Sequence, residues 1–410
     1  MQKDGAILDN TYEFRKNGKH QPDNCGISDT SLASVTGIRL HQSSTVCVTS
    51  SLIGVLIALL CVNIIWRHGD RAPEKVFDAL KVANESFPNG LGNLTALGRL
   101  QAQFVGEKLR RRYFDDNITT SKQVAIRSTK LYRTIETAKI IANEFNVPNV
   151  SVTANIDLKY DTEGNPFYQC YRAQQLIEGF KNNYLMKNEY KDFYNFLHEK
   201  INYDGYVHPI LDQIVCMKYH DLHTPEWTSN NTVMDTMKYL SWIGLCARVG
   251  IEPCKDERLN KLSGGAILNG LIKKLKTAVD CDRYKQNNTN PDCDIYFSGL
   301  SAHDITLAAL FSTFPNYKKI LGNVPYIKYV AHAAFEAFYA NSFRDELKEI
   351  TQYLPGCEHY TTLCPLDNFV RATKGMSYDD VQKECTIGIQ KNRSKRAAYF
   401  AGNLADYMLE

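Results

Sequence analysis

Two arginines flank a histidine in the segment 67–71, R-H-G-D-R, which directly follows an apolar run at 62–66 that predicts a β-strand. Gly69 allows a sharp backbone turn there, because glycine has no Cβ. Each guanidinium group is a planar fork of donors that suits phosphate oxygens. Nearby positive charge disfavours a protonated imidazole, so His68 can act as a neutral nucleophile facing an anion. An isolated R-H-G is more often a solvated basic turn, but its place after a strand favours a functional site.

The same order of strand, loop and helix occurs twice more. A short strand is predicted at 123–127, with Arg133 about one turn into the helix that follows. Another is predicted at 294–300, followed by His303 and Asp304 and then a helical run. In open α/β sheets ligands bind beyond the carboxyl ends of the strands, so these side chains should converge. The converging residues are expected to be Arg67, His68, Arg71, Arg133, His303 and Asp304.

Such a set suits phosphoryl transfer, whose transition state spreads negative charge over oxygens that arginines can stabilise. We expect His68 to be the nucleophile and to form a phosphohistidine that water later hydrolyses. Asp304 would protonate the leaving oxygen and then act as a base toward water, which predicts faster turnover at acidic pH. The phosphate-binding residues would be Arg67, Arg71, Arg133 and His303.

No cofactor and no metal ion are expected. The chain has no paired C-x-x-C units of the kind that hold zinc. His220 and His223 lie three residues apart with no third ligand nearby, and such a pair is more often structural. The net charge of +3 is too small to indicate nucleic acid or a membrane surface as partner. The expected partner is a small phosphomonoester substrate, and a homodimer is left open.

Twelve cysteines and seven N-x-S/T sequons indicate an oxidising, secretory compartment and a glycoprotein. The hydrophobic segment 46–60 has the length of a signal-peptide core and is short for a membrane span. The long leader before this segment and the lack of an A-x-A cleavage site count against a cleaved signal peptide. A signal anchor is therefore about as well supported as a signal peptide, and a membrane anchor near 46–66 stays open. The protein would then be extracellular, lysosomal, or tethered to a membrane and facing away from the cytosol.

The 410 residues exceed one typical domain. Residues 1–45 are polar with balanced charge and predict a disordered tail. The α/β class is expected, as a three-layer α/β/α core with a mixed, mostly parallel sheet. The core would take residues 61–155 and 291–390, interrupted by a mainly helical cap at 156–290 and followed by a tail at 391–410.

Local patterns predict details of the helices. Ser128 is in place to cap the helix that carries Arg133. Arg110, Arg111 and Arg112 are interpreted as charges at a helix end, not as a binding patch. The apolar face of that same helix is predicted from five residues at three-to-five spacing: Leu97, Leu100, Phe104, Leu109 and Tyr113.

The motif R-H-G-D-R-A-P after an apolar strand resembles the phosphate-site signature of the histidine acid phosphatases, in the histidine phosphatase superfamily. The resemblance covers most of the chain from Val62 to Cys385 and is nearest to the prostatic and lysosomal type. Segment 67–71 matches the family's R-H-G-x-R, Arg133 its third phosphate arginine, and segment 301–304 its S-A-H-D element. One departure is Lys130, where the family often has Asp.

The resemblance also implies disulfides. Cys170 should pair with Cys385 and Cys357 with Cys364. Cys216 matches a family cysteine whose partner position, near His332, is not a cysteine here. Two further pairs are expected, Cys281–Cys293 and Cys246–Cys254, and both would leave Cys216 unpaired.

The predicted function is an acid phosphatase that hydrolyses phosphate monoesters. A phytase-like enzyme or a lysophospholipid phosphatase of the same fold is an alternative, and the number of basic residues in the cap lining would distinguish them. A catalytically weak cell-surface binding protein is the alternative from another class. It would be expected to lack His68 or Asp304, and both are present.

Overall fold

The computed structural model describes residues 37–42, 58–114, 120–180, 188–283, 290–322, 327–339, 348–349, 351–360 and 364–387. A mixed sheet in the strand order β4-β3-β5-β2-β6-β1-β7 forms its centre, with β8 paired to β1. The parallel half joins β2 to β5, β5 to β3 and β3 to β4, while β6 and β1 run antiparallel to their neighbours. The strands are β1 (Gly37–Gln42), β2 (Ala58–Arg67), β3 (Val124–Ser128), β4 (Val152–Thr153), β5 (Phe297–Ala302), β6 (His332–Tyr339), β7 (Lys348–Glu349) and β8 (Cys364–Pro365).

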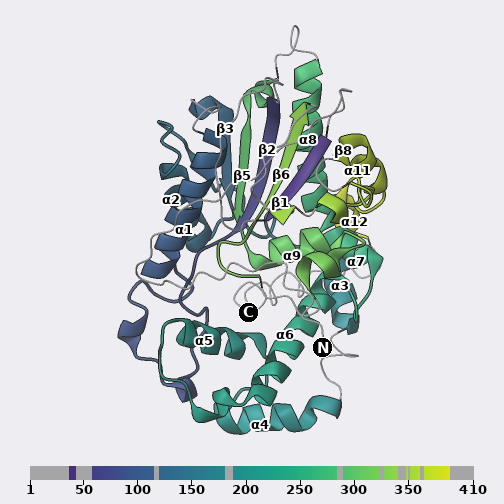
Figure 1. Ribbon diagram of the computed structural model, residues 1–410. Coiled ribbons are helices and arrows are strands. Elements are labelled where there is room, and N and C mark those ends of the chain that lie inside the picture. Colours follow the sequence, from purple (N-terminus) through teal and green to yellow (C-terminus); the bar gives the residue numbers. More distant parts are fainter. Residues whose placement is uncertain are drawn as a thin grey trace, which may run out of the picture.

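Helices cover both faces of this sheet (Figure 1). The helices of the described residues are α1 (Ala96–Leu109), α2 (Tyr132–Asn143), α3 (Tyr171–Phe180), α4 (Lys191–Ile201), α5 (His208–Tyr219), α6 (Asn231–Val249), α7 (Glu257–Ser263), α8 (Gly265–Arg283), α9 (Asp304–Ser312), α10 (Tyr317–Leu321), α11 (Leu366–Ala372) and α12 (Val381–Cys385). Side chains alternate across a strand, so β2 serves both layers. Val62 and Trp66 pack with α1 and α2, whereas Ile65 packs with α8 and α9. The expected three-layer α/β/α architecture is confirmed.

Helices α4, α5 and α6 lie below the sheet in the view of Figure 1, at the end where β2 leads into residues 67–71. They share a hydrophobic cluster of their own, which includes Leu197, Ile210 and Leu240. Phe77 and Leu80, from the segment after β2, complete this cluster. The helical cap is therefore packed onto the same segment that carries the R-H-G-D-R motif.

The structure differs from the expected domain limits at three places. Residues 265–283, expected in the cap, form α8, whose Leu268 and Leu271 pack against the sheet. Residues 58–60, expected in the hydrophobic signal segment, belong to β2 and pair with β6. Residues 37–42, expected in a disordered tail, form β1 at the open edge of β6. In each case strand pairing or packing against the sheet determines to which part of the fold the segment belongs. Local amino-acid composition does not show these tertiary contacts.

Two helix details were wrong. Leu109 and Tyr113 are buried as expected, but the side chains of Leu100 and Phe104 are exposed. Most of the buried face of α1 is instead made by small residues, Gly98, Ala102 and Gly106 among them. Close helix packing favours small residues, because a Cβ at Gly106 would lie 2.8 Å from Glu144 of the neighbouring segment. Ser128 does not cap α2, since its hydroxyl donates to the Thr129 carbonyl and the helix begins only at Tyr132.

Three disulfides link the described residues. The pairs Cys170–Cys385 and Cys357–Cys364 match the family expectation, and Cys281–Cys293 is also formed. The expected pair Cys246–Cys254 was wrong, because both remain separate buried thiols, as does Cys216.

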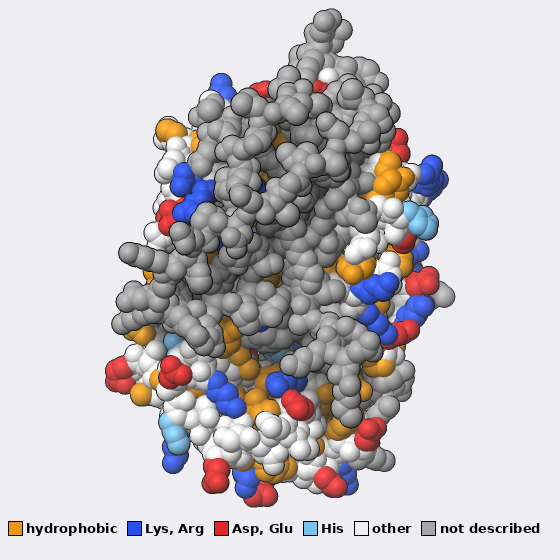
Figure 2. Space-filling model, in the orientation of Figure 1, with side chains coloured by type: hydrophobic (Ala, Val, Ile, Leu, Met, Phe, Trp, Pro, Cys, Tyr) orange, Lys and Arg blue, Asp and Glu red, His pale blue; other side chains and the backbone are white. Residues whose placement is uncertain are grey.

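None of the described helices is long and apolar enough to cross a membrane. Residues 1–36 and 43–57, which hold most of the predicted tail and signal segment, lie outside the described residues, as does the tail at 391–410. On the face shown in Figure 2, basic and acidic side chains are interspersed over the cap.

A buried ion pair connects the end of α1 to the sheet. Arg112, in the turn after α1, donates from Nε and Nη2 to Oε1 of Glu336 at 3.0 and 2.9 Å, and Glu336 is 1% exposed. The Tyr113 hydroxyl donates to the same oxygen at 2.6 Å. Arg112 was expected to be a helix-end charge, but it is turned inward to neutralise a carboxylate on β6.

We expect Arg112→Ala to lower the free energy of unfolding by about 3–5 kcal/mol, because it removes the guanidinium group that pairs with the buried Glu336 carboxylate. Arg111→Ala is the matched control. Its side chain is 70% exposed and lies 3.8 Å from Glu107, so the loss should stay below about 1 kcal/mol. Denaturant unfolding followed by circular dichroism measures both, and equal losses would contradict the buried pair.

Candidate active site

The nucleophile expected from the sequence lies in the first turn after β2. Nδ1 of His68 is 2.8 Å from the carbonyl oxygen of Gly69. A carbonyl oxygen can only accept, so Nδ1 carries the proton and the lone pair of the neutral ring is on Nε2. The ring is buried, and its centroid is 5.6 Å from that of His303 and 5.9 Å from that of Tyr329. The backbone thus fixes both the tautomer and the direction of the imidazole.

Glycine is required where this turn meets α1. A Cβ on Gly69 would lie 2.3 Å from the carbonyl oxygen of Gly98, and a Cβ on Gly98 would lie 2.1 Å from that of Asp70. The Thr95 hydroxyl caps α1 by accepting the Gly98 N–H at 3.1 Å, and it also hydrogen-bonds the buried Asp70 carboxylate. His220 of the cap approaches the same carboxylate through Nε2 at 2.7 Å. His220 therefore holds the turn in place, which is the structural role expected for it.

Arg67 ends β2 and faces Asp304. Its Nη2 is 3.0 Å from Oδ2 of Asp304, which begins α9 directly after β5. Nη1 donates to the carbonyl oxygen of Ile327, and the guanidinium carbon lies 4.2 Å from the ring centroid of Tyr329. Two strand ends that are adjacent in the sheet thus bring a cation and a carboxylate together, as the parallel pairing of β2 and β5 requires.

Arg71 and Arg133 each have a carboxylate partner. Arg71 makes a bidentate pair with Asp212 of α5, at 2.9 and 3.0 Å. Arg133, in the first turn of α2, lies 2.6 Å from Oε1 of Glu74, and Arg71 lies 3.7 Å from that same oxygen. One oxygen therefore contacts both arginines.

His303 is oriented from the neighbouring strand. Its Nε2 is 2.9 Å from the hydroxyl of Thr129, which follows β3 and hydrogen-bonds the Thr134 hydroxyl. The Thr134 hydroxyl itself donates to the carbonyl oxygens of Thr129 and Leu131. Thr134 must then accept from Thr129, and Thr129 accepts from Nε2–H of His303.

Burial and charge set the protonation states. Burial, with the neighbouring guanidinium groups, holds the pKa of His68 well below its usual value. The same two causes, with burial the larger, lower the pKa of His303 to about 3. Burial alone would raise the pKa of Asp304, but Arg67, the nearby histidines and the Ile305 N–H outweigh it and keep that pKa below its usual value. Both imidazoles are thus neutral and the carboxylate is ionised near neutral pH.

All six residues expected at the site lie in one group, defined by these contacts. Four contributors were missed: Glu74, Thr129, Asp212 and Tyr329. Glu74 follows the motif by three residues and could have been suspected from that spacing. Asp212 and Tyr329 are distant in sequence and carry no local signal.

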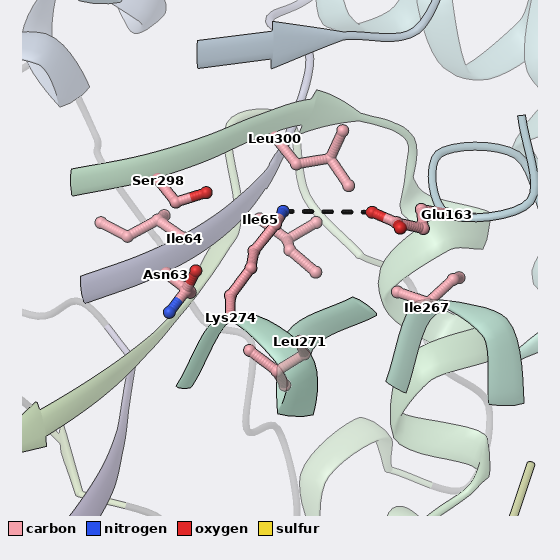
Figure 3. A pocket seen from close by; sticks show the side chains of 9 residues that line it. All are labelled: Asn63, Ile64, Ile65, Glu163, Ile267, Leu271, Lys274, Ser298 and Leu300. Atoms are coloured by element: carbon pink, nitrogen blue, oxygen red, sulfur yellow. Dashed lines mark ion pairs between the residues drawn. The ribbon is translucent and has the colours of Figure 1, made fainter. Parts of the chain in front are cut away.

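Among the described residues, no three histidine, cysteine, aspartate or glutamate side chains are arranged to hold a metal ion. A small cavity between α8 and the sheet includes Lys274, whose Nζ is 4.0 Å from Glu163 (Figure 3). Its lining includes Ile64 and Ile65 from the middle of β2 and none of the six site residues, so it is separate from the arginine-rich group.

Comparisons with known proteins find similar chains and similar folds. The bovine prostatic acid phosphatase is 29% identical over 362 residues, a match that covers 80% of this chain and 87% of that protein. The rat lysosomal acid phosphatase is 28% identical over 370 residues, covering 80% and 81%. The solved phytase from Citrobacter braakii has a similar fold, with a TM-score of 0.56 at 14% identity over 80% of this chain and 99% of that one.

The region that contains β2, α1, β3 and α2 carries the family signal. Residues 58–149 match the family model of the histidine phosphatase superfamily, branch 2. This region holds four of the six site residues, and the two acid phosphatases extend the similarity over most of the remaining chain. Residues 58–149 thus match the histidine phosphatase superfamily, branch 2, and the chain as a whole is similar to prostatic and lysosomal acid phosphatases.

Proposed function

We propose that this protein is an acid phosphatase that hydrolyses phosphate monoesters through a phosphohistidine on His68. The observation that carries the proposal is a neutral imidazole with its lone pair on Nε2, buried among three guanidinium groups. Such a ring can attack phosphorus at acidic pH, where an ordinary histidine would be protonated.

The reaction would proceed in two displacements. Nε2 of His68 forms a bond to phosphorus while the bond from phosphorus to the ester oxygen breaks, and Asp304 gives its proton to that oxygen. An alcohol leaves. Water then attacks the phosphorus, Asp304 takes a proton from it, and the nitrogen–phosphorus bond breaks. Inorganic phosphate is released, and both side chains return to their starting states.

The arginines would bind the phosphoryl group throughout. Arg67, Arg71 and Arg133 supply fixed forks of donors around the position opposite His68. The Nε–H groups of Arg71 and Arg133 are buried and find no acceptor among the described residues. A buried donor without an acceptor destabilises the free site. A bound anion would accept hydrogen bonds from these donors and so remove that unfavourable free energy.

Asp304 must be protonated to act as an acid, yet Arg67 keeps it ionised in the free site. A bound phosphate dianion would replace Asp304 as the partner of Arg67, because Arg67 would turn its donors to the phosphate. The dianion would also add negative charge beside Asp304. Both changes raise the pKa of the carboxyl. Substrate binding itself would therefore prepare the general acid, with protons more available at acidic pH.

A secretory location is also proposed, as an extracellular, lysosomal or membrane-tethered protein. The three disulfides support an oxidising compartment. Glycosylation, a homodimer and an anchor near 46–66 stay predictions that no described contact tests. A phytase-like or lysophospholipid phosphatase activity, and a catalytically weak binding protein, are the alternatives to this proposal.

Replacing His68 by alanine should lower kcat for an aryl phosphate by about 10³-fold or more, because no nucleophile remains. A stopped assay of phosphate release measures this loss. His198→Ala is the control, because that histidine is 51% exposed on α4 and pairs with Asp204. Wild-type turnover in the His68 variant would rule out the proposed intermediate.

Asp304→Asn should lower kcat by about 10²–10⁴-fold for alkyl phosphates. The loss should be smaller for a nitrophenyl ester, whose leaving oxygen needs little protonation. The measurement is the slope of log kcat against leaving-group pKa, which should steepen in the variant. An unchanged slope would remove Asp304 from the role of general acid.

Binding of sulfate, a dianion that mimics phosphate, should be accompanied by proton uptake at about pH 4 to 5. The sign follows from the lowered pKa of Asp304 in the free site, which must rise when the anion takes Arg67. Calorimetry in buffers of different ionisation enthalpy gives the number of protons, and Asp304→Asn should reduce it. Binding without proton uptake would contradict the exchange of partners.

A further inference from the structure

The carboxylate of Glu74 occupies donors on which the proposed function depends. Its Oε1 is 2.6 Å from Nη2 of Arg133 and 3.7 Å from Nη2 of Arg71. Its side chain is 26% exposed, against 13% for Arg133 and 7% for Arg71. The carboxylate therefore lies toward the solvent side of two deeply placed guanidinium groups.

The backbone on either side holds this carboxylate in place. The Glu74 N–H donates to Oδ2 of Asp212 at 3.1 Å, and that oxygen also accepts from Arg71 at 2.9 Å. The Gly92 N–H donates to the Pro73 carbonyl oxygen at 2.9 Å. A Cβ on Gly92 would lie 3.8 Å from Cγ of Glu74 and 3.7 Å from Nη1 of Arg133, so this loop packs against the pair.

In the free site, where Asp304 is ionised, three carboxylates consequently balance the three guanidinium groups. Each of the three guanidinium groups has a carboxylate within 3.0 Å: Arg67 with Asp304, Arg71 with Asp212, and Arg133 with Glu74. His68 and His303 add no charge when neutral. A substrate with several phosphate groups is attracted by excess positive charge. This arrangement has guanidinium donors for one phosphoryl group and no excess positive charge for a second.

We propose that Glu74 is a specificity-determining residue, which limits this site to esters with a single phosphate and disfavours substrates with further phosphate groups nearby. The inference deepens the proposed phosphatase function and rests on it. One phosphoryl group can take donors from Arg67 and Arg71 and share Arg133 with Glu74. A second phosphate beside it would face the Glu74 carboxylate instead of a free guanidinium group.

The test compares the full chain with Glu74→Gln, which keeps the shape and removes the charge. Two substrates are used, a nitrophenyl phosphate and myo-inositol hexakisphosphate, together with inorganic phosphate as inhibitor. We expect the ratio of kcat/KM to shift toward the hexakisphosphate by about tenfold, mainly through KM, and the inhibition constant of phosphate to fall by about 3–10-fold. An unchanged ratio overturns the inference.

Glu136→Gln is the matched control. It makes the same charge change one turn along α2 from Arg133, and Glu136 pairs with Arg99 at 2.6 Å outside the site. This variant should keep the wild-type ratio. Glu74→Asp retains the charge and should keep most of the discrimination, which a purely structural role would not explain. Equal shifts in the Gln variants of Glu74 and Glu136 would also overturn the inference.

Failure of the proposed function is distinguishable from failure of the inference. If the wild-type chain hydrolyses neither substrate, the phosphatase proposal falls. The charge argument is then tested by calorimetry with inorganic phosphate and inositol hexakissulfate. Tighter binding of the hexakissulfate to the Glu74→Gln protein alone would support the selective role of the carboxylate, and equal binding to all variants would refute it.

Discussion

The constraint on which this molecule depends is the burial of three guanidinium groups around one imidazole. Like charges repel and lose their hydration when they are buried together, so each group needs a carboxylate nearby. Asp304, Asp212 and Glu74 meet that need from three separate parts of the chain. The imidazole responds in the opposite way, because the same positive field and the loss of water keep it neutral. Stability of the arginine cluster and availability of the proposed nucleophile thus have one physical origin.

The scaffold explains why these groups meet. Parallel pairing of β2 with β5 and of β5 with β3 aligns three carboxyl ends along one edge of the sheet. The turn at Gly69 then contacts α1 backbone to backbone at Gly98, which no larger residue could permit. This contact selects the small-residue face of α1 for burial and leaves Leu100 exposed. Precise placement of the site therefore overrides the hydrophobic pattern of the helix.

Features that depend on residues close together in the sequence could be predicted. A strand followed by R-H-G-D-R is recognisable because its chemistry and its position lie within ten residues, and the expected strand ends lead to the six expected site residues. Partners brought together only by tertiary structure were missed. Asp212 is 141 positions from Arg71, and the pairing of β1 with β6 joins segments nearly 300 residues apart. The pair Cys246–Cys254 was wrong because proximity in sequence does not ensure disulfide geometry.

The cap is more than a cover over the site, because Asp212 of α5 binds Arg71 and the backbone of Glu74 together. An anion that draws Arg71 away from Asp212 must weaken the contact between cap and core, and an anion that draws Arg133 away from Glu74 weakens the loop beside it. Binding of an anion would therefore exchange internal ion pairs for external ones. The internal pairs that are lost would offset part of the gain, which suits an enzyme that must also release phosphate as its product. With the proposed role of Glu74, the same carboxylates would influence both which phosphate esters bind and how readily phosphate is released.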